Sequence, residues 1–226
     1  HGGGPKVAPG AALAPVYSQK NTALVEKGME NLLAHIENVK LSGIAPVVCI
    51  NHFHTDTEEE MQVIKNASKA AGADVAVSRH WIKGGEGAME LAEVVAAVCE
   101  KKPSLKFLYS DETPLKERIH LIATKVYGAD GVSYTPEAEA KAKAIESDPE
   151  TRKLGTCMVK THLSLSHNPA LKGRPKGWTL PIRDIRVFMG AGFAVPIAGD
   201  IKLMPGMASD AAFRNVDVDV TTGKVK

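Results

Sequence analysis

Two large aromatic side chains stand in the two segments of this chain that are best suited to binding a ligand. Phe53 lies in residues 51–56 (NHFHTD) and Trp81 in residues 79–83 (RHWIK), and each segment directly follows a short apolar run. Aromatic residues make up only 5% of the chain, so the pair stands out. If the runs are neighbouring strands, the two rings can hold a flat heteroaromatic ring between them, at about 1 to 3 kcal/mol per stacked face. Rings folded inward as loop anchors are an equally good interpretation.

A glycine-rich stretch follows Trp81. Lys83, Gly84, Gly85 and Gly87 precede a helical pattern, and glycines at a helix N-terminus can cradle an anion. The stretch is not a Walker A loop, and Glu90 occupies the last position that a G-x-G-x-x-G motif would need. These four residues are therefore phosphate or turn candidates, and a tight turn is the favoured use.

The other polar residues of the chain give weaker indications of a functional site. The side-chain amide of Asn51, at the end of the first apolar run, can read the edge of a bound ring, and an Asx turn explains it equally well. His52, His54 and His80 lack the carboxylate spacing of a metal site. Residues 162–167 contain serine and histidine, but nothing in the sequence orients them as a triad. We therefore assign no catalytic residue and no metal ligand.

The elements that must position the two loops alternate regularly. A helical apolar pattern over 24–39, with Asn21 as N-cap and Gly43 after its end, precedes a strand at 44–50. Thr57 and Glu60 form a capping box that opens a helix to about residue 71. A strand at 73–78, a loop at 79–86 and a helix at 88–98 complete two crossover units. This order predicts an α/β parallel sheet with flanking helices and with its ligand loops at the carboxyl ends of the strands.

The second half has a different texture. Thr113-Pro114 and Thr135-Pro136 are N-cap signals that open helices at 115–127 and at 136 to about 145. The remaining β-type runs are short, and they predict a smaller α+β region with an antiparallel or mixed sheet. These runs are 107–109, 157–159, 179–189, 193–197 and 216–220. We expect an α/β ring-binding portion over 1–105 and a smaller helix-plus-sheet domain over 106–226.

Composition excludes several classes of protein. The 226 residues are 44% hydrophobic, which is globular, and the net charge of +2 is too balanced for nonspecific nucleic-acid binding. Three well-separated cysteines argue against a disulfide framework and against a zinc site, and they suit a reducing cytosol. No apolar run reaches the roughly 20 residues of a membrane span. The chain opens on His rather than Met, so we expect a piece of something longer.

Seven motifs in order resemble the C-terminal half of formate-tetrahydrofolate ligase, and the resemblance covers essentially the whole chain. They are NHFHTDT at 51–57, WIKGGEG at 81–87, KTHLSLS at 160–166, RPKGW at 174–178, RDIR at 183–186, GAGF at 190–193 and MPG at 204–206. The resemblance implies ATP-dependent formylation of tetrahydrofolate with formate. The product is 10-formyltetrahydrofolate, the intermediate is formyl phosphate, and Mg²⁺ and a monovalent cation assist. It also implies a cytoplasmic homo-oligomer.

The resemblance also implies roles for individual residues. Phe53 and Trp81 match the aromatic pair that sandwiches the pterin ring, a slot that purines also use, and Asn51, Thr55 and Asp56 flank it. No G-x-x-x-x-G-K-[ST] occurs in the chain, which implies that the P-loop portion of the ligase lies N-terminal to it. We therefore expect the isolated chain to be inactive and to hold no cofactor tightly. The alternative is a non-catalytic pterin- or purine-binding or assembly module.

Overall fold

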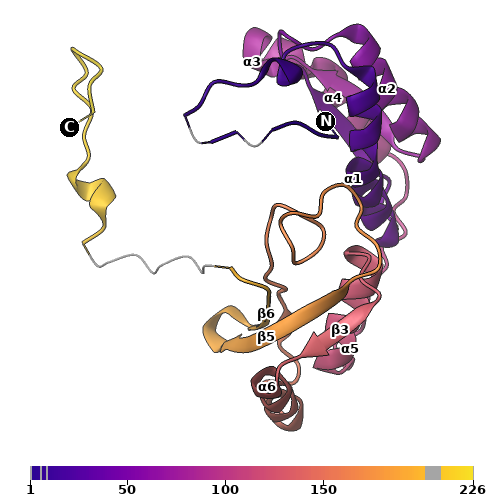
Figure 1. Ribbon diagram of the computed structural model, residues 1–226, viewed down its shortest axis with the longest axis vertical. Coiled ribbons are helices and arrows are strands. Elements are labelled where there is room, and N and C mark those ends of the chain that lie inside the picture. The colour runs from indigo at the N-terminus through magenta and orange to yellow at the C-terminus, as the bar shows by residue number, and fades with distance from the viewer. Residues whose placement is uncertain (1, 6, 9, 202–209, 226) are drawn as a thin grey trace.

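Two sheets organise the chain, and they are joined by one long helix and a connecting segment (Figure 1). The computed structural model describes residues 2–5, 7–8, 10–201 and 210–225. Elements up to residue 99 surround a two-stranded sheet, and those from 115 to 198 build a four-stranded sheet. The chain is thus α/β with one parallel and one mixed sheet. The boundary at 105 falls between the two groups, and independent domains on either side of it stay a prediction.

The first sheet is parallel, as the alternating order predicts. Strand β1 (Val47–Asn51) pairs in register with β2 (Asp74–Ser78), from Val47 opposite Asp74 to Asn51 opposite Ser78. Val48 and Ile50 are buried against α1 and α2, because alternate side chains of a strand share a face. The strand starts three residues later than predicted, after Pro46, which cannot donate a ladder hydrogen bond.

Local capping signals set the helix starts here. Helix α1 (Thr22–Leu41) begins where the Asn21 side chain accepts the Leu24 N–H at 3.0 Å. Helix α2 (Glu58–Ala70) begins with the complete Thr57–Glu60 capping box. Both starts confirm the prediction. After α1, Gly43 has φ of 73°, and a Cβ there would lie 1.7 Å from the Ser104 carbonyl oxygen, so only glycine fits.

The segment after β2 is more ordered than the loop predicted for it. It forms α3 (His80–Lys83), then the 3₁₀ turn η2 (Gly84–Ala88), and runs directly into α4 (Met89–Cys99). A four-residue helix is too short to show periodicity, which is why the pattern did not indicate it.

The second sheet is mixed, with strand order β3-β5-β6-β4. β5 (Thr179–Phe188) and β6 (Phe193–Ala198) are antiparallel, and parallel pairings add β3 (Gly131–Tyr134) to β5 and β4 (Gly155–Thr156) to β6. Helix α5 (Leu115–Leu121), its π-helical continuation η3 (Ile122–Val126) and α6 (Pro136–Ser147) contact this sheet. Leu115, Ile119, Leu180 and Ile182 are fully buried in the core between them. The remaining 3₁₀ turns are η1 (Pro15–Tyr17), η4 (Met189–Ala191) and η5 (Ala212–Asn215).

Four predictions about the second half are wrong. Residues 107–109 form no strand, and Phe107 is 84% exposed. Residues 157–159 lie beside β6, where the Cys157 N–H donates to the Ala194 carbonyl at 3.0 Å, but only Val159 forms a bridge. Of residues 216–220 only Val218 forms a bridge, so apolar composition alone did not suffice to make a strand. The N-cap of α5 is Pro114, because the Thr113 hydroxyl is turned back to the backbone N–H of Ser110. Thr135 caps α6 as predicted.

Helix α1 connects the two parts through its polar face. The Asn31 amide donates to the Gly173 carbonyl at 3.2 Å, and the Asn38 amide donates to the Val126 carbonyl at 3.0 Å. Arg174 forms a two-pronged ion pair with Glu37, and its hydrogen bond holds the pKa of the Glu37 carboxyl below its usual value. The segment around Gly173 is thereby fixed beside α1.

Candidate functional site

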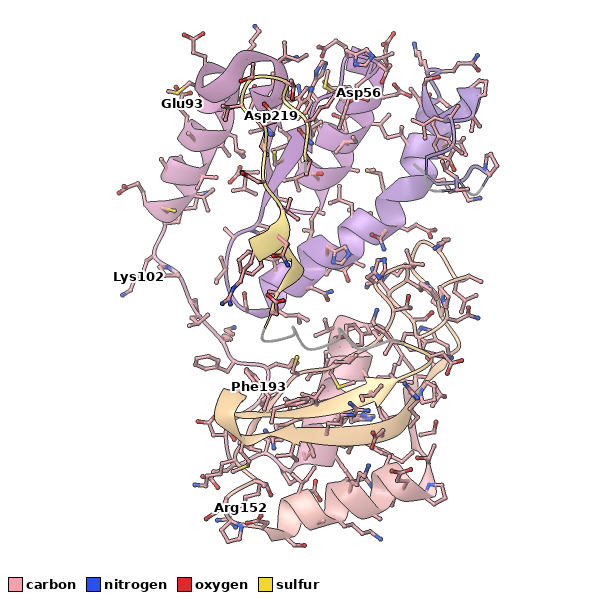
Figure 2. The ribbon with its side chains drawn as sticks, turned by 90° about the vertical axis from the view of Figure 1, so that its left-hand side faces the viewer. Asp56, Glu93, Lys102, Arg152, Phe193 and Asp219 are labelled. Atoms are coloured by element: carbon pink, nitrogen blue, oxygen red, sulfur yellow. The ribbon has the colours of Figure 1, made fainter. Side chains whose placement is uncertain are left out.

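Phe53 and Trp81 stand at the carboxyl ends of adjacent parallel strands. The His52 N–H donates to the Ser78 carbonyl at 3.0 Å, so the segments that follow the two strands remain side by side just beyond the sheet. The Phe53 side chain is 53% exposed and that of Trp81 is 81% exposed. Rings that anchored their loops would be buried, so the structure speaks against the anchor interpretation. Figure 2 shows Asp56, from the same loop as Phe53, at the end of the molecule remote from the second sheet.

The loop that carries Phe53 is closed by Asp56. The Asp56 carboxylate accepts the backbone N–H of Phe53 at 2.8 Å, and the Asp56 N–H donates to the Phe53 carbonyl at 3.0 Å. The Asn51 side chain makes no hydrogen bond with the residues that the structure describes, so the Asx turn is not formed there. Asp56 therefore positions the loop, and the Asn51 amide remains available to a ligand.

The turn that carries Trp81 depends on Gly87. The Arg79 N–H donates to the Gly87 carbonyl at 2.8 Å, and a Cβ on Gly87 would lie 2.5 Å from the carbonyl carbon of Arg79. Gly84 has φ of 58°, which side chains rarely adopt, and its N–H caps α3 by donating to His80. This geometry favours the turn use of the glycines. The phosphate role of Lys83, Gly84, Gly85 and Gly87 has no contact that supports it.

Three of the five predicted ring-site residues line one cavity. Asn51, Thr55 and Asp56 border a space of about 380 Å³ between η1, α1, β1 and α2, with Met29 and Met61 among its apolar walls. Phe53 and Trp81 are not among its lining residues. The structure thus places the two rings at the strand ends, and the three flanking residues open onto the neighbouring cavity.

A larger cleft, of about 850 Å³, lies between α1 and residues 160–173, and sequence reasoning missed it. Polar side chains line both walls. They are Lys27, Asn31, His35 and Asn38 from α1, facing Lys160, His162 and Lys172. The four α1 residues recur at i, i+4, i+8 and i+11, which is one face of a helix. That spacing could have indicated a polar helix face, but nothing in the sequence shows which residues lie opposite this face.

Lys160 is the most enclosed cation of this cleft. Its ammonium lies 4.8 Å from the centre of the Tyr127 ring and donates to the carbonyls of Thr161, at 3.1 Å, and of Ser164. Burial lowers the pKa of Lys160. Burial also raises the pKa of Tyr127, with a smaller contribution from Cys157. In this partly desolvated place an ammonium attracts an anion more strongly than it does at the surface.

The serines of residues 162–167 form hydrogen bonds within their own turn. The Ser166 hydroxyl is buried and donates to the Asn168 carbonyl at 3.1 Å, and the Ser164 and Ser166 hydroxyls lie 2.9 Å apart. His167 packs on Trp178 with ring centres 5.9 Å apart. These contacts form no base–nucleophile pair.

The described part of the chain offers neither a metal-binding cluster nor a membrane-spanning helix. No group of three or more His, Cys, Asp or Glu there is arranged to hold a metal ion. Within the same residues, no helix has the length and apolar character needed to cross a membrane.

Comparisons with known proteins identify the family. The family model for formate–tetrahydrofolate ligase matches residues 1–226. The chain is 62% identical to the formate–tetrahydrofolate ligase of Dehalococcoides mccartyi strain CBDB1, over 38% of that protein, and 59% identical to that of Desulfotalea psychrophila, over 41%. The ligase of Syntrophobacter fumaroxidans is 54% identical, over 38% of its length. In each case the whole chain is covered, so it spans about two fifths of the length of these relatives. The chain belongs to the formate–tetrahydrofolate ligase family.

Proposed function

We propose that this chain is the C-terminal part of an ATP-dependent ligase that formylates tetrahydrofolate with formate, and that it holds the pterin ring of the folate. The observation that carries the proposal is the pair of exposed rings, Phe53 and Trp81, at the ends of two paired parallel strands. Large exposed aromatics are costly to leave in water, and the carboxyl edge of a parallel sheet is where such folds bind ligands. A pterin between the two rings would bury both.

The ring slot needs polar groups to fix orientation, and the Asn51 amide is suited to that role. An amide offers a donor and an acceptor side by side, which matches the alternating donors and acceptors on a pterin edge. Thr55 opens onto the same cavity, and Asp56 holds the loop that carries Phe53. Purines present a similar edge, so the slot would accept them too. In this proposal the chain binds and orients the folate ring and shields it from water.

We place the activation of formate by ATP in the part of the ligase that this chain does not span. The residues present here do not fit a triphosphate: no Walker A sequence occurs in the chain, and the glycines after Trp81 are committed to a turn. We therefore assign the formation of formyl phosphate and the P-loop-type portion outside residues 1–226, and Mg²⁺ and a monovalent cation to the complete enzyme. We also propose that the complete ligase is a homo-oligomer and is located in the cytoplasm.

Activity assays of two proteins test the proposal. The native-length protein that carries this chain should make 10-formyltetrahydrofolate only when ATP, Mg²⁺, formate and tetrahydrofolate are all supplied. The 226-residue chain alone should give no turnover but should bind tetrahydrofolate. A native-length protein that binds pterins or purines without turnover would instead identify a non-catalytic binding module. Turnover by the 226-residue chain would show that the phosphate chemistry lies within it.

A further inference from the structure

The direction of the Trp81 ring is set by the backbone that carries it. The side chain is largely exposed, so packing against neighbours does little to fix it. The backbone beneath it is α3, a helix of four residues, and a helix this short is not stable by itself. Its N-cap, Arg79, makes no side-chain capping bond. The ring therefore depends on the contacts that join α3 to the first sheet, at the end of the molecule remote from the second sheet (Figure 1).

A buried hydroxyl provides one such contact. Ser78, the last residue of β2, is only 1% exposed, and its Oγ lies within hydrogen-bond distance, 2.8 Å, of Nδ1 of His80. His80 is the first residue of α3. No other residue that the structure describes bonds to this hydroxyl. A buried polar group without a partner is costly, so the bond holds the imidazole at the end of the strand.

The main chain of His80 is held as well. Its carbonyl accepts the N–H of Gly84, the residue that ends α3. His80 is thus bonded to β2 through its side chain and to the far end of α3 through its backbone. Trp81 follows His80 directly, so a movement of His80 would carry the ring with it.

Two further contacts hold this turn, and neither replaces the bond between Ser78 and His80. The Arg79 N–H donates to the Gly87 carbonyl at 2.8 Å, which closes the turn on itself. The Arg79 guanidinium lies 3.5 Å from the carboxylate of Glu58 in α2, but the Glu58 side chain is 75% exposed. Exposed ion pairs contribute little. The buried bond is therefore the more effective side-chain link between α3 and the sheet.

We propose that Ser78 and His80 are positioning residues for the ring slot, and that their hydrogen bond sets the direction of the Trp81 ring before a ligand arrives. The inference rests on the proposed function, because it gives the pair a role in binding the pterin. A ring that is already held in its bound direction loses less freedom on binding, which raises affinity. Neither side chain needs to touch the ligand in this role.

The experiment measures tetrahydrofolate binding to the native-length protein by titration calorimetry. Ser78→Ala should weaken binding by about three- to tenfold, the usual effect of losing one hydrogen bond. The matched control is Ser68→Ala. It removes another fully buried serine hydroxyl of the first half, which has no hydrogen-bond partner among the described residues. This control should leave the affinity unchanged.

A double-mutant cycle tests whether Ser78 acts through Trp81. In a Trp81→Ala protein, Ser78→Ala should cause no further loss of affinity, because the ring that it positions is gone.

His80→Asn and His80→Gln provide a second comparison, and the exposed position should let both variants fold. The Asn side chain places a polar atom where Nδ1 stands and can keep the bond to Ser78, whereas Gln places its polar atoms near Nε2. His80→Asn should therefore retain most of the affinity that His80→Gln loses.

Fluorine NMR of the ligand-free protein tests the position of the ring directly. The protein is labelled with fluorotryptophan, and Trp81→Phe identifies the Trp81 signal by its loss. Ser78→Ala should shift and sharpen that signal, because the ring becomes more mobile. Ser68→Ala should leave it unchanged.

Three outcomes would overturn the inference. The first is equal tetrahydrofolate affinity for Ser78→Ala and Ser68→Ala, and the second is a Ser78→Ala loss that is just as large in the Trp81→Ala protein. The third is an unchanged Trp81 fluorine signal in Ser78→Ala. If Trp81→Ala itself leaves tetrahydrofolate binding unchanged, the proposed function fails, and the fluorine signal still decides separately whether the pair positions the ring.

Discussion

The carboxylate of Glu60 accepts the backbone N–H of Asn21 at 2.7 Å. Glu60 is also the capping-box residue of α2, and its other oxygen accepts from Thr57. Asn21 is the N-cap of α1. One carboxylate therefore joins the starts of both helices at the edge where the candidate ring site lies, and it fixes α1 relative to the loop that carries Phe53.

Glu60→Gln should lower the free energy of unfolding by about 1 kcal/mol at pH 7, the usual worth of a cap. Burial acts to raise the pKa of Glu60, but hydrogen bonds from Asn21 and Thr57 outweigh it and lower the pKa. A lowered folded-state pKa means that the contribution is complete above the unfolded pKa of about 4.3 and is lost as pH falls through the folded value. Urea unfolding of both proteins at several pH values should show the difference shrinking below pH 4.

The control for this prediction is Glu59→Gln. Glu59 precedes Glu60 in α2 but forms only an exposed ion pair with Lys20, so its loss should leave the urea midpoint nearly unchanged. A Glu60→Gln protein that matches the control at pH 7 would show that the link between the two helices contributes nothing to stability.

Trp81→Ala should weaken tetrahydrofolate binding by about tenfold or more, because one stacking face is worth about 1 to 3 kcal/mol. Trp81 is 81% exposed, so the change should leave stability intact, which thermal unfolding would verify. Phe107→Ala is the matched control, because that ring is 84% exposed but lies away from the candidate site. The neighbouring Lys106 N–H donates to the carbonyl of Ser42, which precedes β1, so Phe107 lies toward the opposite end of the sheet. Equal folate affinities for the two variants would refute the ring slot.

Gly87→Ala should destabilise the turn that presents Trp81. The added methyl would stand 2.5 Å from the backbone of Arg79, which cannot move aside as a side chain does, and overpacking of this kind costs about 1 to 3 kcal/mol. Gly85→Ala meets nothing within 4 Å and should be almost neutral. Thermal unfolding and pterin binding should separate the two variants. If Gly87→Ala is as stable as Gly85→Ala, the close approach at Arg79 does not hold the turn.

Local signals made several helix starts and both strands of the first sheet predictable. The start of α2 follows from Thr57 and Glu60, and that of α6 from Thr135, because each cap is completed within four residues. Continuous apolar runs predicted both parallel strands. The exposed state of Phe53 and Trp81 could not be read in this way, since the same residue types suit a buried anchor and an open slot.

Features that depend on distant partners were missed. β3 (Gly131–Tyr134) is four residues long and exists because β5 pairs with it. Residues 216–220 have β-type composition, but only Val218 forms a β-bridge. The basic cleft combines Lys27 with Lys160, which are far apart in sequence, so neither segment alone indicates it. Pairing between segments far apart in the chain could not be predicted from this single sequence.

Arg118→Ala should destabilise the second sheet region by about 3 kcal/mol. The Arg118 side chain is only 2% exposed, and its guanidinium donates to the carbonyls of Leu154 and, at 2.8 Å, of Arg152, which holds the segment that enters β4. Its loss removes two charge-assisted hydrogen bonds, leaves two carbonyls without a donor and opens a cavity.

Arg118→Lys can restore one of the two bonds and should recover part of the loss. Arg152→Ala keeps the accepting carbonyl and removes an exposed side chain, so it should cost less than about 0.5 kcal/mol. Urea unfolding measures all three, and an Arg118→Ala midpoint equal to that of Arg152→Ala would show that the buried guanidinium does not brace this segment.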